Sequence, residues 1–190
     1  MRIAVIGTGN IGTALGAAWQ KAGHDVVFGS RRPTNTGPGG APATTVEEAI
    51  KDADVVLLAV PGGAVAELVQ ATGPALTGKI VIDAANRIGA AQLNSRAEIA
   101  AQAQGALYVR AFSTLGWENF VDPPEGADLF FAADPEARAA AEELIGATGL
   151  HPVLVGDADA SGTVDAVLPL WFALVQRSGG NRRLALRVVT

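Results

Sequence analysis

Short apolar runs alternate with helix-forming segments along most of the chain, and these runs have the length of β-strands. The run at 55–60 is apolar at every position, which is typical of a parallel strand buried on both faces. The first helical segment has Ile11, Leu15 and Trp19 at helical spacing. Strands are expected at 2–6, 26–28, 55–60, 79–83, 107–112, 128–133 and 151–155. The alternation predicts an α/β protein with a doubly wound, mostly parallel sheet.

The last part of the chain has a helical pattern of its own. Its apolar residues at helical spacing are Val164, Leu168, Trp171, Phe172 and Val175. Pro169 lies inside this pattern and should kink or restart the helix. We therefore divide the chain into a domain at 1–156 and a small C-terminal helical appendage at 157–190. The appendage is too apolar to stand alone, so it packs on its own sheet or on a second subunit.

The composition limits the classes of function. Of the 190 residues, 49% are hydrophobic, enough for a sizeable core, and the net charge of −5 argues against nucleic acid as the main partner. The chain has no cysteine, which excludes disulfides, thiol catalysis and thiolate metal sites. It starts directly with a strand and has no apolar run near membrane-spanning length. We therefore expect no signal peptide, no membrane contact and a cytoplasmic location.

A glycine-rich turn joins the first strand to the first helix. Gly7 permits a tight turn, Gly9 leaves room for a pyrophosphate, and Gly12 lets the helix lie close to the strand. The free N–H groups at the start of the helix would then meet the phosphates. The turn predicts a dinucleotide site of the Rossmann type, and the alternative is a structural turn in another α/β protein. The site would consist of Gly7, Thr8, Gly9, Asn10, Ile11 and Gly12.

The end of the second strand indicates which dinucleotide binds. NAD-binding domains usually place a carboxylate there, which accepts hydrogen bonds from the ribose hydroxyls. This chain has Ser30, Arg31 and Arg32 instead. A carboxylate would repel a 2′-phosphate, whereas an arginine can bind it through two parallel donors. We therefore predict that the cofactor is NADP, and the alternative is a solvated basic turn.

Two further strand ends are candidates for the nicotinamide half of the cofactor. Ligands of doubly wound sheets lie beyond the carboxyl ends of the strands. One such end carries Ala59, Val60 and Pro61, and the next carries Ala84 and Asn86. The Asn86 side chain could orient a carboxamide or a substrate carbonyl. Alternatively, it is a turn residue that bonds to its own backbone.

A segment crowded with hydroxyls, an amide and aromatic residues follows the strand at 107–112. A flat ring could stack on Trp117, or Trp117 covers the edge of the core. The candidates for contact with a second substrate are Arg87, Ser113, Thr114, Leu115 and Trp117. Both histidines, His24 and His151, are expected on the opposite edge of the sheet. We therefore assign no catalytic acid or base and no metal ligand.

Motifs at several strand ends occur together in one known family. Two of these motifs are the glycine turn and Ser30-Arg-Arg32. The others are Leu58-Ala-Val-Pro61, Asp83-Ala-Ala-Asn86 and Val109-Arg-Ala-Phe-Ser-Thr114. With these motifs the chain resembles the short F420-dependent NADP oxidoreductases over nearly its whole length. The resemblance implies NADP and a deazaflavin, coenzyme F420, as the two cofactors. It also implies a homodimer with the second cofactor near the C-terminal segment.

The predicted reaction is direct hydride transfer between the nicotinamide and a second flat ring. Both partners carry the reactive chemistry themselves. The protein has to hold two carbons in contact and exclude water. Two alternatives remain open. The chain could be an NADPH-dependent reductase of a small imine or a flavin-like acceptor, or a non-catalytic redox sensor that binds NADP and a protein.

Overall fold

The computed structural model describes residues 1–34 and 36–189. Over these residues the chain forms one sheet of eight strands in the order β3-β2-β1-β4-β5-β6-β7-β8. The strands are β1 Arg2–Ile6, β2 Asp25–Gly29, β3 Ala43–Thr44, β4 Val55–Leu58, β5 Ile80–Asp83, β6 Leu107–Arg110, β7 Asp128–Ala133 and β8 His151–Gly156. Neighbouring strands are parallel except for β6 and β7. The expected α/β fold with a mostly parallel, Rossmann-type sheet is confirmed.

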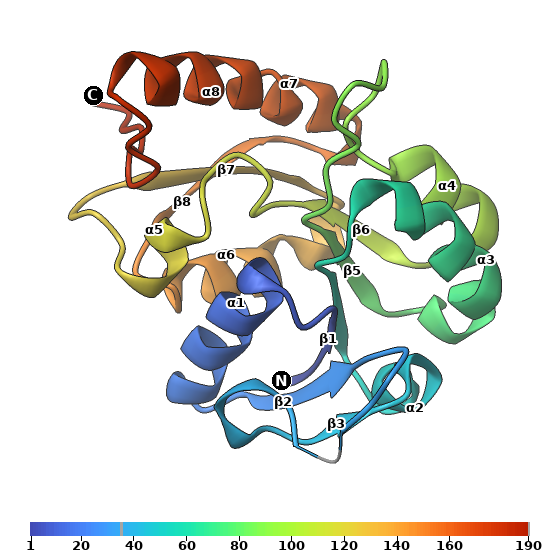
Figure 1. Ribbon diagram of the computed structural model, residues 1–190. Coiled ribbons are helices and arrows are strands. Elements are labelled where there is room, and N and C mark those ends of the chain that lie inside the picture. Colours follow the sequence, from blue (N-terminus) through green and yellow to red (C-terminus); the bar gives the residue numbers. More distant parts are fainter. Residues whose placement is uncertain (35, 190) are drawn as a thin grey trace.

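Helices cover both faces of the sheet, and each face has its own core (Figure 1). The helices are α1 Asn10–Lys21, α2 Val46–Lys51, α3 Val65–Leu76, α4 Arg96–Gln102, α5 Glu118–Val121, α6 Arg138–Gly146, α7 Ser161–Asp165 and α8 Val167–Arg177, with 3-10 turns at η1 Pro38–Gly40, η2 Gly62–Ala64, η3 Pro135–Ala137 and η4 Ala158–Ala160. Buried residues of α1 and α6 belong to one core, and those of α2, α3 and α4 to the other. In β4, Val55 and Leu57 face the first core, and Val56 and Leu58 face the second. Burial on both faces explains why this strand is apolar at every position.

Strands β7 and β8 run against the direction of the others. In the antiparallel pair of β6 and β7, Val109 lies opposite Ala133, and β8 then pairs in parallel with β7. His151, the first residue of β8, therefore lies at the end of the sheet where β1 to β6 have their carboxyl ends. The expectation that His151 lies on the opposite edge is wrong, because the apolar pattern of a strand carries no information about its direction.

The C-terminal segment packs on the same sheet. The helical pattern breaks at Ala166, between α7 and α8, which leaves Pro169 in the first turn of α8, where a proline is tolerated. Trp171 is buried below α8, and its Nε1–H donates to the carbonyl oxygen of Leu184 at 2.7 Å. The backbone N–H of Asp128 donates to the carbonyl oxygen of Leu186 at 2.9 Å. The segment therefore returns to β7 after α8 and shares the core of the sheet.

The helical run Ala158–Arg177 is 20 residues long, and its length and composition are sufficient to cross a membrane. The expectation that no apolar run approaches that length is therefore wrong by this measure. In the structure the run lies against the sheet as η4, α7 and α8 (Figure 1). It contains Asp165, whose carboxylate forms a buried ion pair with Arg110, and Leu168 and Trp171, which belong to the first core.

Candidate functional site

The glycine turn brings β1, α1 and β4 into close contact. Gly7 has a φ of 115°, in the region that favours glycine. A Cβ on Gly7 would overlap with the carbonyl oxygen of Ala59, and a Cβ on Gly12 would overlap with the carbonyl oxygen of Gly7. The N–H of Gly7 donates to the carbonyl oxygen of Gly29 at 3.2 Å. The turn therefore ties together the carboxyl ends of β1, β2 and β4.

The amino end of α1 is open to a ligand. Gly9 is the N-cap, so no side chain accepts the first N–H groups, and the first turn contains no acidic residue. A Cβ on Gly9 would meet nothing within 4 Å, and Thr8, Gly9 and Asn10 are exposed. Backbone N–H groups and the positive end of the helix dipole can therefore bind an anion here.

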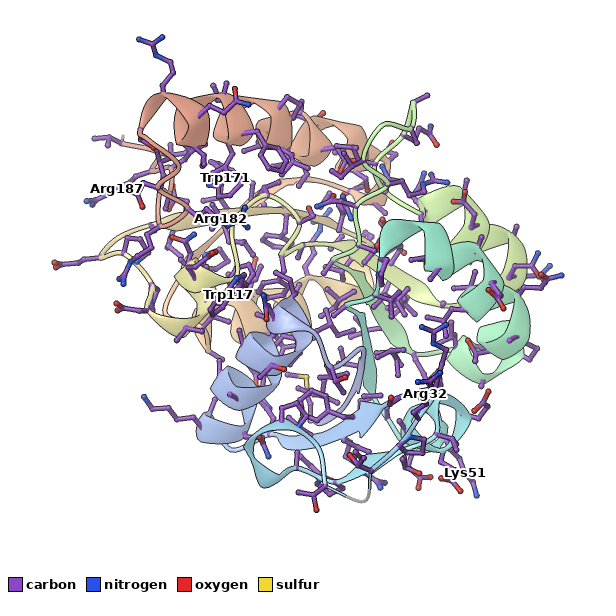
Figure 2. All side chains as sticks on the ribbon, in the orientation of Figure 1. Arg32, Lys51, Trp117, Trp171, Arg182 and Arg187 are labelled. Carbon is purple, nitrogen blue, oxygen red and sulfur yellow. The ribbon has the colours of Figure 1, made fainter. Side chains whose placement is uncertain are left out.

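The end of β2 places two arginines beside this turn. The N–H of Ser30 donates to the carbonyl oxygen of Thr44 at 3.0 Å, and Ser30 Oγ accepts from the N–H of Arg32 at 3.2 Å. The serine hydroxyl thus shapes the turn. Arg31 and Arg32 are exposed, and no ion pair within the described ranges involves either of them. Figure 2 shows Arg32 beyond the end of β2.

The ends of β4 and β5 lie against each other. The N–H of Ala59 donates to the carbonyl oxygen of Ile6 at 2.9 Å, so Ala59 to Pro61 continue beside the glycine turn. A Cβ on Gly62 would overlap with the backbone of Asn86. The sequence interpretation did not single out Gly62, whose only signal is its place directly after a buried strand. The structure thus brings the predicted nicotinamide residues of β4 and β5 together at one edge.

A buried arginine occupies the carboxyl ends of β5 and β6. Arg110 is fully buried, and its Nη1–H groups donate to the carbonyl oxygens of Asp83 at 3.0 Å and Ala85 at 2.6 Å. Its Nη2–H donates to Oδ1 of Asn86 at 2.6 Å. The sequence interpretation missed Arg110 as a site residue. The available signal was a charged residue inside an otherwise apolar strand, because an unpaired charge is costly to bury.

Both polar atoms of the Asn86 side chain have partners within the protein. Oδ1 accepts from Arg110, and Nδ2–H donates to the carbonyl oxygen of Ser113 at 2.7 Å. The side chain therefore does not bond to its own backbone in a local turn, which was the alternative left open. It joins the loop after β5 to the loop after β6, and its contact with a carboxamide stays a prediction.

The loop after β6 combines backbone strain with an unpaired hydroxyl. Phe112 has a φ of 59°, in the left-handed region that a bulky residue rarely adopts. Ser113 and Thr114 are buried, and Ser113 Oγ has no hydrogen-bond partner. Strained residues persist where the surrounding structure holds them, often at ligand sites. Among the candidate residues, Ser113 Oγ and Arg87 Nε are buried polar atoms without a hydrogen-bond partner in the structure.

The other candidates for contact with a second substrate do not gather around Ser113. Arg87 bonds to the carboxylate of Glu98 and to the carbonyl oxygen of Asn94, so its guanidinium holds its own loop. Leu115 is buried in the first core. Trp117 lines a groove of about 650 Å³ with Thr13 and Phe120, beside the first turn of α1 (Figure 2). The structure brings Ser113 and Thr114 close to Asn86 through the Ser113 carbonyl, whereas the Arg87 side chain is already engaged by its own loop.

Two buried titratable groups lie below Arg110. Oδ2 of Asp83 accepts from the N–H of Ser95 at 2.7 Å and from the hydroxyl of Tyr108 at 2.9 Å. Burial raises the pKa of Asp83, and the Arg110 guanidinium opposes that rise. Burial, together with the Asp83 charge, raises the pKa of Tyr108 well above its ordinary value. These groups support the strand ends from below and are shielded from a ligand.

Tyr108 is the only tyrosine, so its titration can be followed directly. We expect no phenolate absorbance near pH 10 while the chain is folded, because the folded-state pKa lies above the unfolded value. The folded state keeps a proton that the unfolded state loses, so stability should fall as the pH rises above about 10. Absorbance and circular dichroism measured together test this. Reversible phenolate formation near pH 10 in a chain with native dichroism would contradict it.

Neither histidine lies beside the glycine turn: His24 is at the opposite end of the strands, and His151 is at the same end but on β8, with β4, β5, β6 and β7 between β8 and β1. His24 precedes β2 at the amino end of the strands, and its Nδ1 lies 3.4 Å from the amino group of Met1. His151 lies 3.0 Å from Asp128, on β8, which β7 separates from β6. Within 1–34 and 36–189 no three histidine, aspartate or glutamate side chains form a group that could hold a metal ion. The edge therefore offers amide, hydroxyl and guanidinium groups.

Comparison with known proteins gives a family match for the first part of the chain. The model of the family described as "NADP oxidoreductase coenzyme F420-dependent" matches residues 2–87. Among curated proteins, the metalloreductase STEAP3 of Rattus norvegicus is 27% identical over 184 residues, which are 90% of this chain. The chain spans only 38% of the length of that protein.

Three solved structures share the fold. A proposed F420-dependent NADP reductase from Arthrobacter sp. FB24 has a TM-score of 0.86 and 23% identity, with full coverage of both chains. A hypothetical protein, SMa0349 from Sinorhizobium meliloti, has a TM-score of 0.70 and 30% identity, covering 85% of this chain and 88% of its own. An imine reductase from Aspergillus terreus, in complex with NADPH4 and dibenz[c,e]azepine, has a TM-score of 0.70 and 21% identity, covering 94% of this chain and 63% of its own.

The family match covers the glycine turn, the arginine pair and the ends of β4 and β5. These are the elements whose geometry suits an adenine dinucleotide with an extra phosphate. NADP-dependent oxidoreduction is therefore the chemistry that family and geometry share. Residues 2–87 of the chain match the family of coenzyme F420-dependent NADP oxidoreductases.

Proposed function

We propose that the protein exchanges a hydride between NADP and a deazaflavin of the coenzyme F420 type. The observation that carries this proposal is the loop after β6, where Phe112 is strained, the Ser113 hydroxyl is buried and unpaired, and the Ser113 carbonyl accepts from Asn86. This loop provides polar contacts for a second ring at the edge where the strand ends would hold the nicotinamide. The match of the family model supports the choice of deazaflavin.

The residues of the edge fit NADP. The amides of α1 have no competing cap, and the space beyond Gly9 is free for a pyrophosphate. Arg31 and Arg32 would bind the 2′-phosphate, and Ala59 to Pro61 would border the nicotinamide. The nicotinamide and the deazaflavin supply the hydride chemistry themselves. This chain has to hold the two rings face to face and keep water away.

Mixing the protein with NADPH and oxidised coenzyme F420 tests the partner. Hydride transfer would convert NADPH to NADP⁺, while the deazaflavin takes up the hydride and one proton from water. We expect the F420 absorbance to fall as NADPH is consumed in equal amounts. The Arg31→Ala variant is the matched control, which should need about tenfold more NADPH for the same rate.

The alternatives predict different results in the same assay. NADPH consumption with a cyclic imine but not with F420 would favour an imine reductase, a function that the Aspergillus terreus neighbour carries on this fold. Tight NADPH binding without turnover of any acceptor would favour a redox sensor. Either outcome would overturn the deazaflavin proposal and leave NADP binding in place.

We also propose that the protein is a homodimer, as the family resemblance implies. Helix α8 leaves Leu170 at 52% and Phe172 at 41% exposed, while Leu168 and Trp171 face the core. A second copy that covers these side chains would remove exposed apolar area from water.

A further inference from the structure

An aspartate of α7 reaches the buried arginine from a distant part of the chain. Oδ1 of Asp165 accepts from Nε–H of Arg110 at 2.7 Å and lies 2.7 Å from Nη2. The other oxygen, Oδ2, accepts from the N–H of Asn94 at 3.2 Å and from its Nδ2–H at 2.7 Å. The carboxylate therefore joins α7 to β6 and to the loop between β5 and α4.

All three nitrogens of the Arg110 guanidinium have partners. Nε bonds to Asp165, Nη1 to the carbonyl oxygens of Asp83 and Ala85, and Nη2 to Asp165 and Asn86. A guanidinium held at every nitrogen has one orientation. Because it donates to Asn86, it also selects one orientation of that amide, with Oδ1 toward Arg110 and Nδ2–H toward the Ser113 carbonyl.

Stability alone gives a weak reason for such a pair. Removing a guanidinium and a carboxylate from water is costly, and well-packed apolar residues of similar volume often stabilise a core equally well or better. Arg110 is fully buried and the Asp165 side chain is only 9% exposed. What the pair does achieve is a fixed arrangement of Asn86 and the Ala85 carbonyl at the edge of the candidate site.

We propose that Arg110 and Asp165 are positioning residues for the nicotinamide half of the nucleotide. Helix α7 holds Arg110 through Asp165, and Arg110 holds Asn86, which links the loops after β5 and β6. The C-terminal segment thereby sets the shape of the edge where the ring binds, although it supplies no contact to the adenine half. The inference rests on the proposed NADP site.

The test compares two nucleotides on one variant. Asp165→Asn replaces one acceptor oxygen with an amide nitrogen, which must face a donor of either Arg110 or Asn94. We expect the Kd of NADPH to rise about tenfold, the loss typical of one charge-assisted hydrogen bond. Adenosine 2′,5′-bisphosphate carries the adenine half without the nicotinamide, and its Kd should change by less than about twofold. Isothermal calorimetry measures both.

Two further variants make the outcome decisive. Asp159→Asn changes an exposed carboxylate of the same helical segment and should leave both Kd values unchanged. Asn86→Ala removes the half-buried side chain that joins Arg110 to the Ser113 carbonyl. It should weaken the binding of NADPH but not of adenosine 2′,5′-bisphosphate. This variant therefore replaces Asp165→Asn in the test if Asp165→Asn does not fold. If a variant weakens the binding of both nucleotides equally, the Arg110–Asp165 pair has a merely structural role. If NADPH binding is unchanged, the pair does not position the nicotinamide site. Either result overturns the inference. Wild-type protein that binds neither nucleotide would overturn the NADP site itself.

Discussion

Replacing Gly12 with alanine is expected to destabilise the fold and to abolish measurable NADPH binding. The new Cβ would overlap with the carbonyl oxygen of Gly7 and approach Cγ1 of Val5 to 3.1 Å. The overlapping atom belongs to the backbone, so the turn itself has to move. Overpacking of this kind costs about 3 kcal/mol, which corresponds to a fall in Tm of about 6 °C or more for a chain of this size. Thermal melting with and without NADPH measures both effects.

Gly9→Ala is the matched control, because it adds the same methyl group to the same turn. Its Cβ would point into open space, so the Tm of the free protein should not change. The methyl group would nevertheless stand where the pyrophosphate approaches the backbone, so NADPH should bind about tenfold more weakly. A stable Gly12→Ala protein with normal NADPH binding, or a Gly9→Ala protein with undiminished binding, would show that the phosphates lie elsewhere.

Replacing Arg31 and Arg32 together with alanine is expected to remove the preference for NADPH over NADH. Each charge-assisted hydrogen bond contributes about 1.5–3 kcal/mol. Arg31→Ala alone should therefore weaken NADPH about tenfold, and the double variant about a hundredfold. NADH lacks the 2′-phosphate, so its binding should barely change. Titration of both nucleotides by calorimetry gives the ratio directly.

Arg177→Ala is the control for the change in net charge. Arg177 is an exposed arginine in the last turn of α8. Its loss should leave both nucleotides unaffected, apart from long-range attraction that salt screens. Equal losses for NADPH and NADH in the double variant would mean that the arginines stabilise the turn rather than read the 2′-phosphate. A wild-type preference for NADH would contradict the assignment of NADP altogether.

Local chemistry explains which features could be predicted from the chain. The glycine turn depends on residues that are neighbours in sequence, since Gly7 and Gly12 belong to one strand–turn–helix unit. The arginine pair lies just after the end of β2, so its position could be predicted from the strand pattern. The buried strand β4 is identifiable because both of its faces meet apolar cores. Fold class and cofactor could therefore be inferred before the tertiary structure was known.

Long-range pairing decided the remaining features. Because β7 is antiparallel to β6 and β8 is parallel to β7, His151 lies at the opposite end of the sheet from the one expected. The sequence of β8 does not indicate in which direction the strand runs. The bond between Trp171 and the Leu184 carbonyl, and the return of the tail to Asp128, likewise depend on how α8 lies on the sheet. The helical stripe indicated only that α8 needed an apolar partner.

By itself, the amino-acid sequence determined the glycine turn, the arginine pair after β2 and the order of strands and helices, because each depends on residues close in the chain. Only the tertiary structure showed how residues far apart in the chain meet at the carboxyl ends of β5 and β6. Arg110 and Asp165 are each a charged residue in an apolar stretch, and neither stretch reveals the partner of the other. The physical reason is that a buried charge requires a partner but does not specify which residue supplies it.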